Sequence, residues 1–68
     1  MEQEKELLLI LEEINNELNN EIKKLIDLLL HEDIENINLY NFYLKINDLL
    51  TKRNITKDKI IHLRLSNY

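Results

Sequence analysis

The chain contains no cysteine, no glycine and no proline among its 68 residues. Without cysteine it can form neither disulfide bonds nor thiolate metal sites. Without glycine or proline, tight turns depend on asparagine and aspartate, and no residue interrupts a helix sharply. Only two histidines are present, His31 and His62, so we expect no histidine-rich metal site within one chain. These absences leave apolar packing, within or between chains, as the source of stability.

Leucine and isoleucine make up most of the apolar residues, and strong helix formers (leucine, glutamate and lysine) dominate the chain. A chain of 68 residues forms one domain at most, and a domain of this size buries only about 60% of its unfolded surface. Since disulfides and metals are excluded, oligomerisation is the remaining way to enlarge the core. We therefore predict an all-α fold over residues 1–68, in which a helical hairpin forms a homodimeric bundle.

Residues 3–30 predict one long amphipathic helix. Its apolar stripe advances in steps of four and three residues that repeat after about 11 residues, so the stripe runs nearly straight along the helix. A leucine zipper, by contrast, repeats after about seven residues and winds around its partner. We predict that this stripe forms the interface with a second copy or a partner; it consists of Leu7, Leu11, Ile14, Leu18, Ile22, Leu25 and Leu29.

Four asparagines lie at the centre of this helix, although asparagine is a poor helix former. By helical-wheel position Asn16 and Asn20 face solvent and Asn19 lies at the side. Asn15 borders the apolar stripe, where an amide can pair with its symmetry mate and fix the register of a dimer. The alternative is that all four are solvated residues of the polar face.

Residues 37–53 predict a second helix after the link HEDIEN, with Asp33 or Asn36 as its N-cap. The first half of this helix is apolar nearly all round, which is typical of a helix that is surrounded by protein. One hairpin cannot surround a helix, whereas a dimer can. We therefore add Tyr40 and Leu44 to the predicted interface.

Thr56 is a good N-cap residue, and it predicts a short third helix over residues 57–65. The alternating pattern of the segment IIHLRLS leaves a strand over residues 60–66 as the alternative. No other segment offers a strand to pair with, so we expect helix. Together the second and third helices match the length of the first and can fold back along it.

The charges are divided unevenly along the chain. Residues 1–35 hold 11 acidic and 3 basic side chains, and residues 36–68 hold 2 acidic and 6 basic ones. Opposite charges of this kind favour one orientation of the helices over others. A basic cluster could also contact the phosphates of RNA or DNA; it consists of Lys52, Arg53, Lys57, Lys59 and Arg64.

No pattern of catalytic or metal-binding residues is present in the sequence. Glu17 and Glu21 are spaced as in carboxylate metal bundles, but the Glu-x-x-His motif of those bundles is absent. We therefore expect a solvated acidic face. Neither His31 nor His62 has a nucleophile nearby in sequence, and no glycine-rich loop could hold a phosphate. We expect no enzymatic activity, no cofactor and no metal site.

The segment NDLLTKRNITKDKII, residues 47–61, resembles the first link of phage-repressor-type helix-turn-helix domains. The sequence stops where the recognition helix of that family would begin, so we do not expect DNA reading of that kind. The same segment is similar to the helical hairpin by which the Sin repressor and its antirepressor pair. That resemblance implies a protein that works by docking helices onto a partner.

The sequence therefore predicts a small non-catalytic interaction protein, a regulator or inhibitor that docks helices onto an unidentified protein partner. One alternative is a helical hairpin dimer that binds RNA or DNA through the basic cluster, and another is a purely structural oligomer. No apolar run approaches the roughly 20 residues of a membrane span. The N-terminal segment is acidic where a signal peptide is basic, so we expect no membrane association and a cytoplasmic location.

Overall fold

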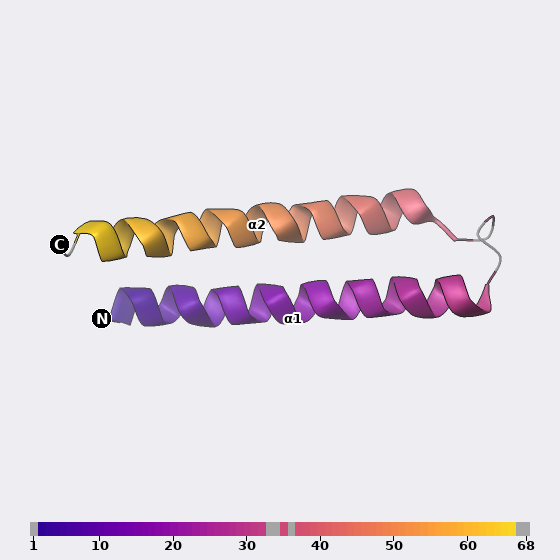
Figure 1. The fold of residues 1–68 in the computed structure, drawn as a ribbon, viewed down its shortest axis with the longest axis horizontal. Coiled ribbons are helices and arrows are strands. Elements are labelled where there is room, and N and C mark those ends of the chain that lie inside the picture. The colour runs from indigo at the N-terminus through magenta and orange to yellow at the C-terminus, as the bar shows by residue number, and fades with distance from the viewer. Residues whose placement is uncertain (1, 33–34, 36, 67–68) are drawn as a thin grey trace.

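In the computed structural model, which describes residues 2–32, 35 and 37–66, the chain forms two helices, α1 (Glu2–His31) and α2 (Leu39–Ser66). The helices lie side by side and run in opposite directions, so the start of α1 lies beside the end of α2 (Figure 1). The predicted all-α hairpin is confirmed. No strand occurs in these described residues, and residues 60–66 are helical.

The predicted break between a second and a third helix is not found, because α2 continues through residues 54–56. Thr56 does not cap a new helix there. Its side-chain Oγ1 donates a hydrogen bond of 2.8 Å to the backbone carbonyl of Lys52, one turn earlier in the same helix. A threonine hydroxyl that bonds in this way is satisfied inside a helix. The link expected from the resemblance to helix-turn-helix domains is therefore absent from α2.

Asn38 caps the start of α2. Its side-chain Oδ1 accepts a hydrogen bond of 3.1 Å from the backbone N–H of Asn41, as an N-cap residue does for the first turn of a helix. The predicted caps, Asp33 and Asn36, lie outside the described residues. At the end of α1, the backbone N–H of Glu32 donates to the carbonyl of Leu28 at 2.8 Å, which extends the helical bonding by one residue.

The two helices meet along a seam whose residues are spaced alternately by three and four in each helix. This is the seven-residue repeat of helices that pack along their whole length at a shallow angle. On α1 the buried and half-buried residues are Glu4, Leu7, Leu11, Ile14, Leu18, Glu21, Leu25 and Leu28. On α2 the corresponding buried or half-buried residues are Phe42, Ile46, Leu49, Arg53, Thr56, Ile60 and Leu63, and the repeat begins at Leu39, which is exposed.

The seam within the hairpin departs from the predicted 11-residue stripe at two positions. Glu21 and Leu28 face α2, while Ile22 and Leu29 are exposed. The reason lies in α2, whose own contacts repeat after seven residues. A helix stays in contact with such a partner along its whole length only if its own contact residues also repeat after seven residues.

The buried core of the hairpin is small. Ile14, Leu18 and Leu49 form a buried cluster, against which Ile46 and Leu50 are packed. Among the described residues the only other buried apolar side chain is Ile60. A pair of helices has a single contact face each, so most of their surface stays exposed.

The overall dimensions also show that the hairpin is less compact than a globular domain of its size. It measures 53 × 16 × 12 Å, and its radius of gyration is 15.9 Å, whereas a compact domain of this length has about 11 Å. The accessible surface is 5683 Å², and a compact monomer of this mass exposes about 4,600 Å². The hairpin thus exposes about 1,100 Å² more than a globular chain of its size.

We expect Leu49→Ala to lower the free energy of unfolding by about 2–3 kcal/mol, because Leu49 is 4% exposed and lies in the buried cluster. Leu65→Ala is the matched control, since Leu65 lies on the same helix and is 61% exposed; its effect should stay within about 0.5 kcal/mol. Urea unfolding followed by circular dichroism measures both. Equal losses in the two variants would contradict the seam described above.

Candidate functional site

One side of the hairpin, next to the seam, carries most of the exposed apolar surface near the link. We call this surface the apolar flank; it consists of the exposed Ile22, Ile26 and Leu29 of α1 and Tyr40 and Tyr43 of α2, together with the half-buried Leu50 of α2. The rings of Tyr40 and Tyr43 are stacked, with centroids 6.4 Å apart. A shallow hollow of about 280 Å³ opens beside Tyr43 and Leu50, and apolar seam residues form most of its wall.

Toward the chain ends the same side of the hairpin becomes polar. Asn15 and Asn19 of α1 and Asn47 and Asn54 of α2 occupy positions next to the seam or one step further out, and all four are exposed. We call these four residues the asparagine belt. The central asparagines of α1 therefore do not interrupt its seam with α2. They end the apolar flank.

Beyond the asparagine belt, nearer the chain ends, this side carries an apolar and a charged pair of residues. Leu8 of α1 and Ile61 of α2 are exposed and apolar. Glu12 of α1 and Lys57 of α2 carry opposite charges and are also exposed. On α1 the order along this side is thus apolar, charged, amide and apolar, from the chain ends to the link. On α2 the order is the same, except that the half-buried Leu50 lies between Asn54 and Asn47.

The opposite side of the hairpin is a charged groove between the helices, with a volume of about 330 Å³. Acidic side chains line it from α1 and basic side chains from α2. Its main members are Ile10, Glu13, Glu17, Lys52, Ile55 and Lys59. Opposite charges across such an exposed groove contribute little stability, but they favour this orientation of the helices.

At the link end of this groove Glu21 is buried and bound by two lysines. The Nζ atom of Lys45 donates to Oε1 of Glu21 at 2.9 Å from across the seam, and that of Lys24 donates at 3.4 Å from the next turn of α1. The hydrogen bond from Lys45 lowers the pKa of Glu21, although burial acts in the opposite direction. The same bond raises the pKa of Lys45.

The prediction of a solvated acidic face was wrong for Glu21. The signal that identifies it is its spacing, three residues after Leu18 and four before Leu25, which continues the seven-residue repeat. Its charge concealed this role, because the neighbouring Ile22 fits an apolar stripe better. A buried ion pair at such a position contributes more to a unique register than to stability.

The structure divides the residues that we predicted for the interface into two groups. Leu7, Leu11, Ile14, Leu18 and Leu25 pack against α2 of the same chain. The exposed members are Asn15, Ile22, Leu29, Tyr40 and Leu44. Of these, only Leu44 lies off the side that carries the apolar flank and the asparagine belt.

The basic cluster is also divided. Lys52 and Lys59 line the charged groove, whereas Lys57 lies on the side of the apolar flank. Arg53 is a seam residue whose Nε atom is buried without a hydrogen-bond partner. Arg64 donates to the carboxylate of Glu4 on α1. These five cations therefore do not form one continuous basic face.

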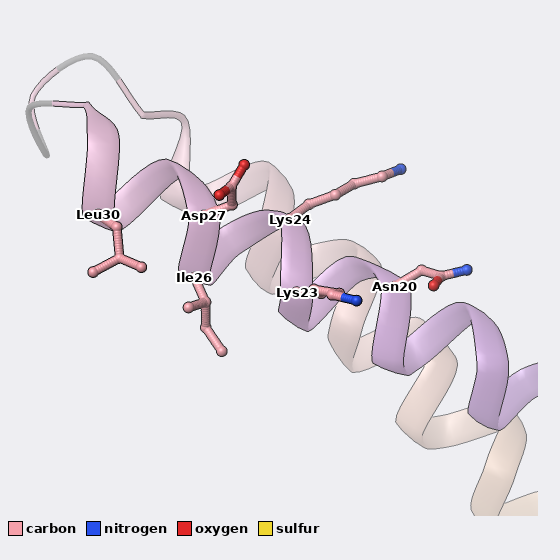
Figure 2. A pocket seen from close by; sticks show the side chains of 6 residues that line it. All are labelled: Asn20, Lys23, Lys24, Ile26, Asp27 and Leu30. Atoms are coloured by element: carbon pink, nitrogen blue, oxygen red, sulfur yellow. The ribbon is translucent and has the colours of Figure 1, made fainter.

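A third hollow, of about 590 Å³, lies on α1 alone near the link. Figure 2 shows that Ile26 and Leu30 project from the same side of α1 there, while α2 lies behind and contributes no side chain. The hollow is an open depression, and no nucleophile with an adjacent base lines it. In the described part of the chain no group of three potential metal ligands comes together.

Comparison with family models, with curated proteins and with solved structures gives no match for this chain. Neither α1 nor α2 contains a stretch apolar enough, over the length required, to cross a membrane.

The pKa of Glu21 predicts how acid affects the hairpin. Because the folded-state pKa lies below the ordinary value of 4.5, the Glu21 carboxylate stabilises the fold above that pH, and this stabilisation is lost as pH falls through the folded-state pKa. We expect the melting temperature of the parent to fall more steeply between about pH 5 and pH 2 than that of Glu21→Gln. Glu13→Gln, an exposed change on the same helix, should keep the slope of the parent. Equal slopes for the parent and Glu21→Gln would contradict the role of this carboxylate.

Proposed function

We propose that the protein is a small non-catalytic interaction module that forms a homodimeric helical bundle and acts as a regulator or inhibitor by docking helices onto a protein partner. The observation that supports this proposal is the apolar flank, with Ile22, Ile26 and Tyr43 exposed on a chain that buries few apolar side chains. Soluble monomers rarely expose contiguous apolar patches of this kind unless the patch binds something.

The surface area of the hairpin supports the same proposal. A stable protein interface of standard size takes about 800 Å² from each partner. The hairpin exposes about 1,100 Å² more than a compact chain of its mass, so covering one side would bring it close to ordinary proportions. The positions of the tyrosines fit an interface as well, because tyrosine is enriched where interfaces bind most strongly.

Regulation follows if another protein competes for this surface. A helical face on the regulated protein, with the same order of apolar and polar residues, replaces the second copy on the apolar flank. Pairing with the hairpin then covers that face of the regulated protein and blocks its other interactions. No chemical step is required.

The layout of the basic cluster weighs against nucleic-acid binding. Phosphate contacts need several cations on one face, but here two lie in the charged groove and one pairs with Glu4. A purely structural oligomer differs in another way, because its assembly would leave no apolar flank for any other protein.

We expect Ile22→Glu to weaken the dimer at least tenfold, because a charge would replace an apolar side chain on the apolar flank. Ile10→Glu is the matched control, since both isoleucines belong to α1 and have similar exposure (39% and 45%), but Ile10 lines the opposite side. Sedimentation equilibrium gives the dissociation constants, and circular dichroism shows whether each variant is folded. A parent that stays monomeric at high micromolar concentration would contradict the dimer.

The regulatory role is tested by capture from the native cell. Tagged parent, Ile10→Glu and Ile22→Glu chains serve as three baits, with mass spectrometry as the readout. We expect a protein that the parent and Ile10→Glu retain and that Ile22→Glu loses. If the only protein captured in this way is the chain itself, the purely structural oligomer is the better interpretation.

A further inference from the structure

We infer that the second copy covers the apolar flank in one particular alignment, with both links at the same end, so that α1 of each copy packs against α2 of the other. This inference rests on the proposed dimer. It concerns the full length of that side of the hairpin, including the asparagine belt and the residues nearer the chain ends. The inference comes from the order of residue types along the rod.

Two ion pairs across the hairpin show which residues lie at the same level along the rod. Glu21 of α1 bonds Lys45 of α2 near the link, and Glu4 bonds Arg64 near the chain ends. Since the helices are antiparallel, moving a number of residues forward along α1 corresponds to moving the same number of residues backward along α2. The side that carries the apolar flank therefore has pairs of residues at common levels: Leu8 with Ile61, Glu12 with Lys57, Asn15 with Asn54, Asn19 with Leu50, Ile22 with Asn47, Ile26 with Tyr43, and Leu29 with Tyr40.

Five of these seven levels contain residues that suit one another. The levels nearest the link are apolar in both helices, and so is the level of Leu8 and Ile61. The level of Glu12 and Lys57 has opposite charges. Between them, the level of Asn15 and Asn54 holds two amides, each of which can both donate to and accept from the other. The next two levels, Asn19 with Leu50 and Ile22 with Asn47, each hold one amide and one apolar residue.

A two-fold axis parallel to the helices brings equal levels of two copies together. Such an axis places α1 of one copy over α2 of the other, so Leu8 meets the second copy's Ile61 and Ile26 meets its Tyr43. Glu12 then faces the second copy's Lys57. Asn15 meets the second copy's Asn54, and buried amides are known to fix the register and orientation of helical assemblies.

The reversed alignment, with the links at opposite ends, matches the levels poorly. It places α1 over α1, so that two net acidic helices lie together. At full overlap Glu12 would lie near the second copy's Ile22, and Lys57 near its Asn47. The carboxylate of Glu12 would lose water without gaining a partner, which is unfavourable. The pattern of residues therefore favours the alignment with both links at the same end. The attraction between the net acidic α1 of one copy and the net basic α2 of the other favours the same alignment.

Because the chain has no cysteine, single cysteines can report the alignment directly. We expect a mixture of Leu8→Cys and Ile61→Cys chains to form a mixed disulfide dimer under mild oxidation by oxidised glutathione. A mixture of Leu8→Cys and Ile26→Cys chains should give at least tenfold less, because these positions meet only in the reversed alignment. Non-reducing gels and mass spectrometry of the linked peptides measure the yields.

A charge exchange gives an independent measurement. Glu12→Lys and Lys57→Glu should each weaken the dimer several-fold, because like charges then face each other, and the double variant should recover most of the affinity.

Sedimentation equilibrium of the reduced chains separates the proposed dimer from the proposed alignment. A monomer overturns the dimer and the alignment together. A dimer that links Leu8→Cys to Ile26→Cys, links neither mixture or links both, or that shows no recovery in the double variant, overturns the alignment alone.

Discussion

Two helices lying side by side can each bury only one face, and this constraint governs the whole molecule. The seam between α1 and α2 conceals Ile14, Leu18, Leu49 and Ile60, and little else that is apolar. The chain is nevertheless rich in leucine and isoleucine, so the remainder must lie outside the seam. That remainder is not scattered evenly, because near the link it gathers on one side of the rod.

The seam itself gives up stability at several positions where leucine would pack better. Glu21 occupies one of them and is held by Lys45 and Lys24, while Arg53 and Thr56 occupy two others. Polar groups at such positions reduce the number of registers in which two helices can pair. A hairpin without glycine or proline to set its turn needs such restrictions, since an all-leucine seam could slide by one repeat.

The sequence predicted the all-α hairpin, the bounds of α1 to within a residue or two and the helical character of residues 60–66. It predicted an apolar stripe that includes Ile22, because hydrophobicity favours isoleucine there, whereas the seam with α2 uses Glu21, which the repeat of α2 selects. It misread Thr56, since a threonine hydroxyl can cap a helix or bond within one, and only the buried position of Thr56 against α1 decides between these. Which apolar residues lie in the seam and which lie in the apolar flank could not be predicted from either helix alone, because it depends on how the two helices pack.

The uneven distribution of buried residues also affects how the rod opens. Its buried apolar side chains lie at mid-length and toward the chain ends, whereas Leu25, Phe42 and Leu39 near the link are half-buried or exposed. A hairpin is usually tightest where the link joins its arms and frays at its free ends. In this molecule the backbone amides beside the link should exchange with solvent first in dilute solution, and association over the apolar flank should slow that exchange.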